Sequence, residues 1–513
     1  MKFLTVEQMR DAEQAAAQAG GIPSMVLMRR AGIALARAVT QFAGLRDTRK
    51  AVLVAGHGNN GGDACVAARC LHEDGFRVQV LLACAPDQLR GDAFTAYAEM
   101  RMAEVPDSVL ESVDDWDTPD SIAQDLTGRP CVVVDGILGS GCKGAPRGVA
   151  GRAIRWVNQM RGPALVVSAD LPSGVDGDTG EMPGDVVRAD ATVTFGRPKA
   201  CFRNDPVAEK SGHLIVADIG VGDAGVGDGD CGLIALPELK ADAPALPWAA
   251  HKGTAGHVCI VGGSGAYPHA PVLVALGALK SGAGLVTLAV PPQSAYAAAA
   301  WTPEAILRPC EVMTEGLGTF DALVAGPGLG QGPDAAGLLA QVLSVPDTRL
   351  VLDADGLNIL AHLHKTGAWK PRDGQQLMLT PHPGEAARLL GCSTEEVQSD
   401  RTGAVRKLAD TFQAVAVLKG AGSLVCAPGG IPLLNRTGNP GMAAGGMGDV
   451  LAGVVGALWA RHADGAWAAA AGVWAHGTAG DAAALRQGQA SLTATVLAQH
   501  LPLAFVEMLT TNH

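Results

Sequence analysis

The chain has 513 residues, of which 48% are hydrophobic and 67 are glycines, and its formal net charge is −12. At about 150 residues per domain this length predicts several domains, and the composition argues against disorder. The negative charge argues against a nucleic-acid partner but leaves a small anionic substrate open. The eleven cysteines form no CxxC pair, the first residues are too polar for a signal peptide, and the apolar runs are too short to cross a bilayer. We therefore expect a cytoplasmic protein without a zinc site, a disulfide framework or a membrane contact.

The N-terminal segment predicts two helices and a strand. Residues 5–8 form a capping-box sequence that opens a helix, and Gly20 is placed to end it. A second helix is expected over 25–39, and the apolar residues 51–55 indicate a short buried strand.

A polar, glycine-rich segment follows that strand. Residues 56–63 read GHGNNGGD and precede a helix expected over 64–72. A strand, a glycine-rich loop and a helix in this order form a ligand-binding turn in α/β sheets. Asn59, Asn60 and Asp63 can bind hydroxyls or a cation, and the alternative is a turn that merely needs Asn and Gly. We favour binding, because two Asn and one Asp among four glycines exceed what a turn requires.

Two later strands each end in an aspartate. Strands are expected over 77–82, 131–135 and 164–170, and Asp135 and Asp170 stand at the carboxyl ends of the last two. Open α/β sheets bind their ligands at that edge.

The loops at this edge carry two further signals. Asn60, Asp135 and Ser173 supply oxygens of the kind that hard cations prefer, and their three loops are expected to meet. The segment 139–144 matches the G-x-G-x-x-G dinucleotide fingerprint, with Asp170 as a conceivable ribose ligand. That fingerprint normally follows the first strand of its unit, so a redox cofactor site is the minority interpretation.

A domain boundary is expected within 220–250. The segment contains GVGDAGVGDGDCG and a Pro/Ala-rich tail, and neither strand nor helix periodicity persists in it. We place the cut near Asp230, which divides the chain into domains 1–229 and 230–513.

The second domain again alternates strands with helices, and most strands end in a small polar or glycine loop. The expected strands are 257–261, 285–290, 322–325, 350–353, 377–380 and 414–419. Their loops point to one long cleft. The sequence contains no Gly-Lys-Ser/Thr, so a P-loop is excluded.

The segment 438–449, GNPGMAAGGMGD, opens an apolar helix. Gly445, Gly446 and Gly448 leave backbone N–H groups unshielded at the positive end of the helix dipole, which suits a phosphate. Asp449 beside them can act as a base or hold a metal, and the alternative is a plain N-cap.

Two further residues stand at strand ends. His382 lies between two prolines and either contacts a substrate, which we favour, or braces a turn. Lys419 opens the run KGAGS and either contacts a nucleotide phosphate or is a solvated strand end, the more common case for a lone lysine.

These motifs together resemble the bifunctional NAD(P)H-hydrate repair enzymes over nearly the full length of the chain. The first half resembles NAD(P)H-hydrate epimerase through NNGGD, VDGILGSGCKG and DLPSG. The second half resembles ADP-dependent (S)-NAD(P)H-hydrate dehydratase through GPGLG, LDADGLN, LTPHPGE, LKGAGS and GNPGMAAGGMGD.

The resemblance implies an α/β fold of two domains, a Rossmann-like three-layer αβα epimerase domain and a ribokinase-like αβα dehydratase domain. Water added at C6 of the reduced nicotinamide ring inactivates the cofactor, giving the hydrates NADHX and NADPHX. The epimerase interconverts the R and S hydrates, and the dehydratase uses ADP to phosphorylate the C6 hydroxyl of the S form. Loss of phosphate then restores NAD(P)H, with release of AMP. The implied ions are K⁺ in the first domain and Mg²⁺ in the second.

The resemblance also implies site residues. The K⁺ ligands would be Asn60, Asp135 and Ser173. The catalytic residues would be Asp449, as the base, and Asp135. The first domain would bind the hydrate through Asn59, Asn60, Gly61, Gly62, Asp63, Gly139, Ser140, Gly141, Cys142, Lys143, Gly144, Ala145 and Asp170. The second domain would bind it through Ala270, Gly328, His382 and Asp449. The nucleotide would contact Lys419, Gly420, Ala421, Gly422, Ser423 and Gly448.

The sequence departs from the family pattern at four small residues. Ala64 stands where a third glycine is usual, and Gly136 and Gly356 stand where alanine is usual. Ser423 replaces the more usual threonine and keeps its hydroxyl. We expect altered packing and retained function.

Three other functions remain open. The second domain can be a kinase of a small hydroxylated metabolite, which would release a stable phosphate ester. The first domain can be a non-catalytic binding or regulatory module, or an NAD-dependent oxidoreductase. We also expect a homo-oligomer, because Ala/Gly-rich helices such as 467–485 can pack against a neighbouring copy.

Overall fold

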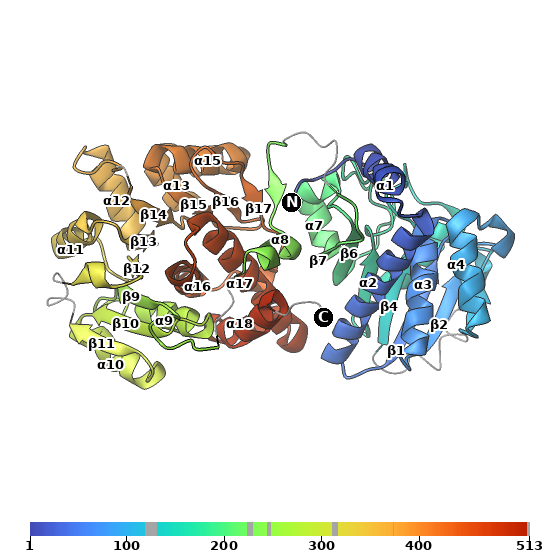
Figure 1. Ribbon diagram of the computed structural model, residues 1–513, viewed down its shortest axis with the longest axis horizontal. Helices are drawn as coiled ribbons and strands as arrows, with labels where there is room; N and C mark the ends of the chain where they lie inside the picture. The colour runs from blue at the N-terminus through green and yellow to red at the C-terminus, as the bar shows by residue number, and fades with distance from the viewer. Residues whose placement is uncertain (118–130, 223–228, 244–247, 310–315, 373, 510–513) are drawn as a thin grey trace. The chain divides into compact units, whose positions relative to one another are not determined.

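The computed structural model describes residues 1–117, 131–222, 229–243, 248–309, 316–372 and 374–509. The chain forms two compact units, Met1–Gly229 and Asp230–His513. Each unit is built around a largely parallel β-sheet flanked by helices (Figure 1). This confirms the predicted α/β architecture of two domains. Among the described residues, no helix combines the length and the apolar character needed to cross a membrane.

The first unit has a seven-stranded parallel sheet in the order β3-β2-β1-β4-β5-β6-β7. Its strands are β1 (Lys50–Ala55), β2 (Arg77–Leu82), β3 (Asp107–Val109), β4 (Cys131–Gly136), β5 (Ala164–Ala169), β6 (Ala191–Phe195) and β7 (His213–Ala217). The strand order reverses between β1 and β4, and loops that leave a sheet at such a switch point diverge and leave room for a ligand.

Helices cover both faces of this sheet. They are α1 (Val6–Gly20), α2 (Ser24–Leu45), α3 (Asn59–Glu73), α4 (Gly91–Met102), α6 (Gly148–Met160) and α7 (Asp205–Ser211). Helices α2, α3 and α4 pack side by side (Figure 1). Helix α6 buries Ile154, Trp156 and Val157 against strand residues that include Val52 and Val133. The predicted capping box at Thr5 is present, and Gly21 ends α1 with a φ of 61°.

Helix α3 begins five residues earlier than predicted. It spans Asn59–Glu73, so NNGGD forms its first turn instead of a loop before it. Glycine disfavours helices, which is why the sequence indicated a loop. Tertiary packing explains the difference, because a Cβ at Gly61 would lie 1.9 Å from the Gly56 carbonyl oxygen and one at Gly62 would lie 2.8 Å from Met28. Only glycine allows the helix to approach its neighbours this closely.

The second unit has a ten-stranded sheet in the order β11-β10-β9-β12-β13-β14-β15-β16-β17-β8. Strands β9 to β15 are parallel to one another, whereas β16 runs antiparallel to both of its neighbours. The strands are β8 (Gly232–Leu233), β9 (His257–Val261), β10 (Leu285–Val290), β11 (Ile306–Pro309), β12 (Ala322–Ala325), β13 (Arg349–Leu352), β14 (Gln376–Leu379), β15 (Val415–Leu418), β16 (Leu424–Cys426) and β17 (Leu433–Leu434). The switch point lies between β9 and β12.

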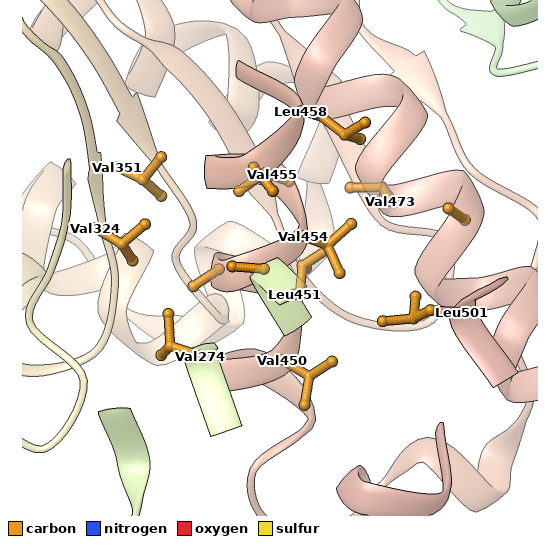
Figure 2. Close-up of a cluster of buried hydrophobic side chains, with 14 of the residues drawn as sticks. Val274, Val324, Val351, Val450, Leu451, Val454, Val455, Leu458, Val473 and Leu501 are labelled. Carbon is orange, nitrogen blue, oxygen red and sulfur yellow. The ribbon is translucent and has the colours of Figure 1, made fainter. Parts of the chain in front are cut away.

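The helices of the second unit include the buried one that the sequence predicted. They are α8 (Leu236–Ala241), α9 (Ala270–Lys280), α10 (Pro292–Trp301), α11 (Pro333–Ser344), α12 (Asp355–Lys365), α13 (Pro383–Leu390), α14 (Thr394–Ser399), α15 (Arg401–Phe412), α16 (Met447–Arg461), α17 (Gly465–Gln487) and α18 (Ala494–Leu509). Figure 2 shows the side chains of α16 among those of α9, α17, α18 and the sheet. The labelled residues are Val274, Val324, Val351, Val450, Leu451, Val454, Val455, Leu458, Val473 and Leu501.

Helices α16 and α9 cross at paired glycines. A Cβ at Gly453 would lie 1.9 Å from the carbonyl oxygen of Val274, and one at Gly277 would lie 2.2 Å from that of Val450. The two backbones therefore touch without intervening side chains. This contact fixes the start of α16, where the predicted base lies.

Most of helix α17 is not available to pack against another copy. Its residues 467–480 are buried within the second unit. Their apolar surface belongs to the core and gives no support for a homo-oligomer, so the oligomeric state stays a prediction.

Candidate functional site

Asp135, at the carboxyl end of β4, is fully buried and accepts hydrogen bonds at both oxygens. Its Oδ2 accepts from the Ser168 hydroxyl at 2.8 Å and from the Ser173 backbone N–H at 2.9 Å. Its Oδ1 accepts from the Ser173 hydroxyl at 2.5 Å and from the Ile137 N–H at 3.2 Å. Burial raises the pKa of Asp135, and the hydrogen bonds from Ser173 and Ser168 oppose that rise. The carboxyl group thereby joins the loops that follow β4 and β5.

Asn60 and Ser173 meet at the backbone of Leu138. The Asn60 side-chain amide donates to the Leu138 carbonyl at 3.0 Å, and the Leu138 N–H donates to the Ser173 hydroxyl at 2.8 Å. The Asn60 Oδ1 atom is buried and accepts no hydrogen bond from the described residues. The structure thus brings the three predicted cation ligands together and leaves one of their oxygens unsatisfied, which buried amides rarely tolerate without a ligand.

The predicted hydrate-binding loop 139–145 lies beside this group. A Cβ at Gly139 would stand 3.2 Å from the Cβ of Asn60, so the loop rests on the first turn of α3. The exposed Lys143 pairs with Asp176 at 3.0 Å and with Asp178 at 3.3 Å. These ion pairs tie the loop to the segment after β5.

Asp170, the first residue after β5, pairs with the buried Lys199. Lys199 also donates to the Phe195 carbonyl at 2.9 Å and to the Thr194 hydroxyl at 3.2 Å. Asp63 on α3 is buried nearby, and burial, followed by the charge of Asp170, raises its pKa well above the ordinary value. The loops after β1, β4 and β5 thus converge as predicted, and a lysine that the sequence did not single out lies among them.

In the second unit, Asp449 lies in the first turn of α16. Gly446 occupies the N-cap position with a φ of 85°, a conformation that favours glycine. Burial, followed by the negative charge of Asp353, raises the pKa of Asp449 to about 7, and the charge of Lys419 opposes that rise. No hydrogen bond to its carboxylate comes from the described residues. Its side chain is therefore not the N-cap that we weighed as an alternative.

Lys419 lies among three carboxylates. Its ammonium group is 2.5 Å from Asp353 Oδ1 and 3.9 Å from Glu385 Oε2, and the charge of Asp449 also acts on it. Only 18% of the side chain is exposed, so the solvated strand end considered from the sequence is wrong. A Cβ at Gly448 would lie 3.2 Å from Lys419 Nζ, which places the glycine turn of α16 against this ammonium.

Glu385 is the third carboxyl group of this cluster. Burial raises its pKa to about 7, against the opposing charge of Lys419. Within the described ranges, no three His, Cys, Asp or Glu side chains stand close enough together to hold a metal ion. The ammonium group of Lys419 lies between the carboxyl groups instead.

His382 caps helix α13. Its ring Nδ1 accepts from the Gly384 backbone N–H at 3.0 Å, and the His382 backbone N–H donates to Glu385 Oε2 at 2.8 Å. Burial, followed by the charges of Lys419 and Arg388, lowers its pKa, which favours the neutral ring. The bracing role is therefore present in the structure, and the contact with the hydrate stays a prediction.

Ala270 and Gly328 adjoin each other at the switch point. Ala270 is the first residue of α9, and Gly328, with a φ of 67°, follows β12. A Cβ at Gly328 would lie 3.0 Å from the Cβ of Ala270 and 2.7 Å from the carbonyl oxygen of Tyr267. The structure thus joins two predicted hydrate contacts from segments far apart in the sequence.

The predicted nucleotide loop 419–423 is a closed turn. The Ser423 hydroxyl donates to the Gly420 carbonyl at 3.0 Å, and Gly420 and Gly422 have φ values of 139° and 61°. Arg401 donates to the carbonyls of Lys419 at 3.4 Å and of Gly422 at 3.2 Å. The loop is held in shape by its own atoms and by α15.

Comparisons with known proteins agree with this geometry. A family model described as NAD(P)H-hydrate dehydratase matches residues 258–503, and one described as YjeF-related protein N-terminus matches residues 24–201. The chain is 37% identical to the bifunctional NAD(P)H-hydrate repair enzyme of Moorella thermoacetica, over 98% of this chain and 96% of that one. This chain belongs to the bifunctional NAD(P)H-hydrate repair enzymes. The enzyme of the same description from Coxiella burnetii is also 37% identical, over 96% of this chain and 97% of that one.

A solved structure supports the fold of the second unit. A ribokinase-like superfamily protein from Enterococcus faecalis is 25% identical, with a TM-score of 0.50, over 55% of this chain and 98% of that one. This repair enzyme is thus bifunctional, with a YjeF-related unit followed by a ribokinase-like unit.

Two departures of this repair enzyme from the family pattern lie against each other. A Cβ at Gly136 would stand 2.7 Å from the Cβ of Ala64, closer than real Cβ atoms approach. The methyl group that the family usually carries after the strand aspartate is here carried by the facing helix. A methyl group at Gly136 would meet the one that Ala64 carries and would also lie 3.1 Å from the carbonyl oxygens of Asn60 and Val54, which the sequence alone did not reveal. At Gly356, an added Cβ would lie 2.9 Å from the carbonyl oxygen of Ala325.

Sequence reasoning did not assign a role to several residues of these sites. Lys199 follows β6, a strand that we did not predict, and the alternation in ATVTF before GRPK was the available signal. Asp353 and Glu385 stood inside quoted motifs without a role, and Arg401 acts from a helix that no motif includes.

Proposed function

We propose that residues 1–229 interconvert the R and S hydrates of NADH and NADPH, and that residues 230–513 dehydrate the S form with ADP. The products would be NAD(P)H, AMP and phosphate. The observation that carries the proposal is Asp449, a carboxyl group with its pKa raised to about 7 at a glycine-rich helix entrance. General bases are most effective when their pKa lies near the working pH.

In the second unit, Asp449 accepts the proton of the C6 hydroxyl as that oxygen attacks the terminal phosphoryl group of ADP. The backbone N–H groups at Gly445, Gly446 and Gly448 face the phosphoryl oxygens and stabilise their charge. Phosphate then leaves C6 and a proton leaves C5, which restores the dihydropyridine ring. Lys419, beside Gly448, offsets the charge of the surrounding carboxylates and, with the turn 419–423, contacts the nucleotide.

Magnesium would meet two carboxyl groups beside that turn, both of which already face Lys419. Asp353 and Glu385 offer the oxygen ligands that this ion prefers, and both lie within 3.9 Å of Lys419 Nζ. These two residues would hold the ion, and a bound Mg²⁺ would share the negative charge of the phosphates. Ala270, Gly328 and His382 would position the hydrate.

Potassium fits the first unit. Asn60 Oδ1 is buried without a partner, and Ser173 and Asp135 place further oxygens at the same loops. Asn60 would hold K⁺ through its unsatisfied oxygen, and Asp135 and Ser173 would reach the ion only by giving up hydrogen bonds that they make in this structure. The charge of the ion would fix the loops that bind the hydrate. Because the hydrogen bonds to Asp135 occupy both of its oxygens, we propose that Asp135 supports the reaction by shaping this cradle.

The proposal is tested with separated R and S epimers of NADH hydrate. The reduced-nicotinamide absorbance is followed with Mg²⁺ and K⁺, with and without ADP. We expect ADP-dependent recovery of NADH from both epimers, and slower recovery from the R epimer when a larger organic cation replaces K⁺. A stable phosphorylated hydrate, or no recovery from either epimer, would contradict the proposal and favour a metabolite kinase.

A further inference from the structure

Asp170 has an unusual backbone. Its φ is 61°, and the Ala169 carbonyl accepts from the Leu171 N–H at 2.7 Å, so Asp170 is the central residue of a three-residue turn. Turns of this kind with positive φ are rare for residues other than glycine and cost energy. Strain at an aspartate beside a ligand-binding edge points to a functional use of that side chain.

One carboxylate oxygen of Asp170 accepts hydrogen bonds, and the other accepts none from the described residues. Oδ1 accepts from Lys199, and weakly from the Thr194 hydroxyl at 3.4 Å and the Phe195 N–H at 3.5 Å. No described residue donates to Oδ2, although Asp170 is only 7% exposed. Lys199 is 2% exposed and has acceptors in Asp170, Thr194 and Phe195, so its ammonium group cannot turn away. The result is an oriented carboxylate with one unsatisfied oxygen.

Asp63, on α3, is a second buried carboxyl group whose charge state is affected by that of Asp170. Asp63 and Asn60 lie three residues apart on α3 and therefore share a helix face. The charged groups that act on Asp63 are Asp170 after β5, Glu13 on α1 and Lys199 before the short helix at 200–203. Burial, the main cause, raises the pKa of Asp63 and that of Glu13. Paired carboxyl groups in different protonation states are a common source of acid–base catalysis.

We propose that Asp170 and Asp63 are the catalytic base and acid of epimerisation, and that Lys199 is the positioning residue that holds Oδ1 of Asp170 and leaves Oδ2 free. This inference rests on the proposed function of the first unit and assigns its chemistry to named groups.

The chemistry balances without a redox partner. Asp63 donates its proton to the C6 hydroxyl, the C6–O bond breaks, and water leaves as the ring nitrogen lone pair forms a C=N bond. Water then adds to the opposite face of C6 while Asp170 Oδ2 accepts its proton. One water is lost and one is gained. Return of the proton from Asp170 to Asp63 resets the pair.

The test follows epimerisation directly. Separated R hydrate is incubated without ADP, so that the dehydratase is idle, and the epimers are resolved by chromatography. We expect Asp170→Asn and Asp63→Asn each to lower the enzymatic rate by roughly 100-fold or more. Lys199→Met should lower it by at least about tenfold, and Lys199→Arg should restore part of the loss because it returns the charge. Lys210→Met, which removes an ion pair with Glu209 in the same unit, is the matched control.

The pH profile separates chemistry from structure. The wild-type epimerisation rate should fall as pH rises through the pKa of Asp63, because the acid must be protonated. This fall is the alkaline limb of the pH profile, and it should be absent from the profile of Asp63→Asn. Lys199 lowers the pKa of Asp63, so Lys199→Met should move the limb to higher pH. A reduced rate with an unmoved limb would overturn the positioning role of Lys199.

Recovery of NADH from S hydrate with ADP is measured on every variant. If the wild-type chain neither interconverts the epimers nor recovers NADH, the proposed function fails. If it does both and the two Asn variants keep rates within about threefold of wild type, only this inference is overturned. Should Lys199→Met fail to fold, as judged by urea unfolding, the isosteric Asn variants decide the assignment of the acid and the base, and Lys199→Arg decides that of Lys199.

Discussion

Asp135 and Asp449 are aspartates at the ligand-binding edges of their units, but Asp135 is fully buried whereas Asp449 is half-buried, and their surroundings differ. Asp135 accepts hydrogen bonds at both oxygens and has no exposed surface. Asp449 receives none from the described residues, and burial beside Asp353 raises its pKa to about 7. A carboxylate whose oxygens are all engaged holds structure in place, whereas one left unsatisfied is available to a substrate.

Asp449→Asn tests whether the unsatisfied carboxylate is the catalytic base. We expect the ADP-dependent dehydration of S hydrate to fall by roughly 1,000-fold, because the amide cannot accept the hydroxyl proton. Epimerisation should be unchanged, and the exposed Glu304→Gln serves as the control. A residual rate above about a tenth of wild type would mean that another group is the base.

Asp135→Asn should lower the stability of the first unit and leave the dehydratase reaction unchanged. The amide cannot accept all the hydrogen bonds that Asp135 receives from Ser168, Ser173 and Ile137, so we expect the first unit to lose about 3 kcal/mol of unfolding free energy. Urea unfolding measures this loss, and activation by K⁺ should weaken. Dehydration of S hydrate should stay at the wild-type rate. An undiminished unfolding free energy would show that the hydrogen bonds to Asp135 are not what holds these loops.

Gly136, directly after Asp135, allows the packing around that carboxylate to be tested. Gly136→Ala should cost about 2 kcal/mol, since its methyl group would meet the Cβ of Ala64. The double change with Ala64→Gly should recover part of that stability, because the added Cβ would still lie 3.1 Å from the carbonyl oxygens of Asn60 and Val54. Urea unfolding of both single variants and the double variant gives the coupling energy, and additive effects would show that the two residues do not contact each other in this way.

The smallest expected effect is the pH dependence of Asp449. The rate of dehydration should rise up to tenfold per pH unit below about 7 and then level off, because the base works deprotonated. Since Lys419 lowers the pKa of Asp449, Lys419→Met should move this limb to higher pH. Glu385 also has a pKa raised to about 7, so the limb belongs to the coupled carboxyl groups. If the rise of the dehydration rate occurred at the same pH in Lys419→Met, Lys419 would not affect the pKa of the titrating carboxyl groups.

For the same reason, stability should depend on pH. The pKa of Asp449 is raised from 3.8 to about 7 on folding, so the folded state binds more protons between these values. The free energy of unfolding should therefore fall as pH rises from about 4 to 7. Asp449→Asn should flatten that dependence in urea titrations of the second unit.

Local pattern predicted much of this molecule. The apolar spacing after Asp449 predicted the buried helix α16, and the aspartates at strand ends predicted where loops would converge. Predictions failed where tertiary contact overrides local preference, as at Gly61 and Gly62 in the first turn of α3.

Long-range ion pairs escaped prediction altogether. Lys199 reaches Asp170 across 29 residues, and Lys419 reaches Asp353 across 66. No local spacing encodes such pairs, because only the sheet order brings the strand ends together. The distribution of charge in both sites could thus be read only from the fold.

The glycine crossing of α9 and α16 limits how the dehydratase can be engineered. Gly277 touches the carbonyl of Val450, the residue after Asp449, and Gly453 lies one helical turn beyond it. Any larger residue at either glycine must displace helix α16, and Asp449 would move with it. A change of the site around Asp449 for a bulkier substrate would therefore require a redesign of this helix crossing first, since the crossing has no room for one added methyl group.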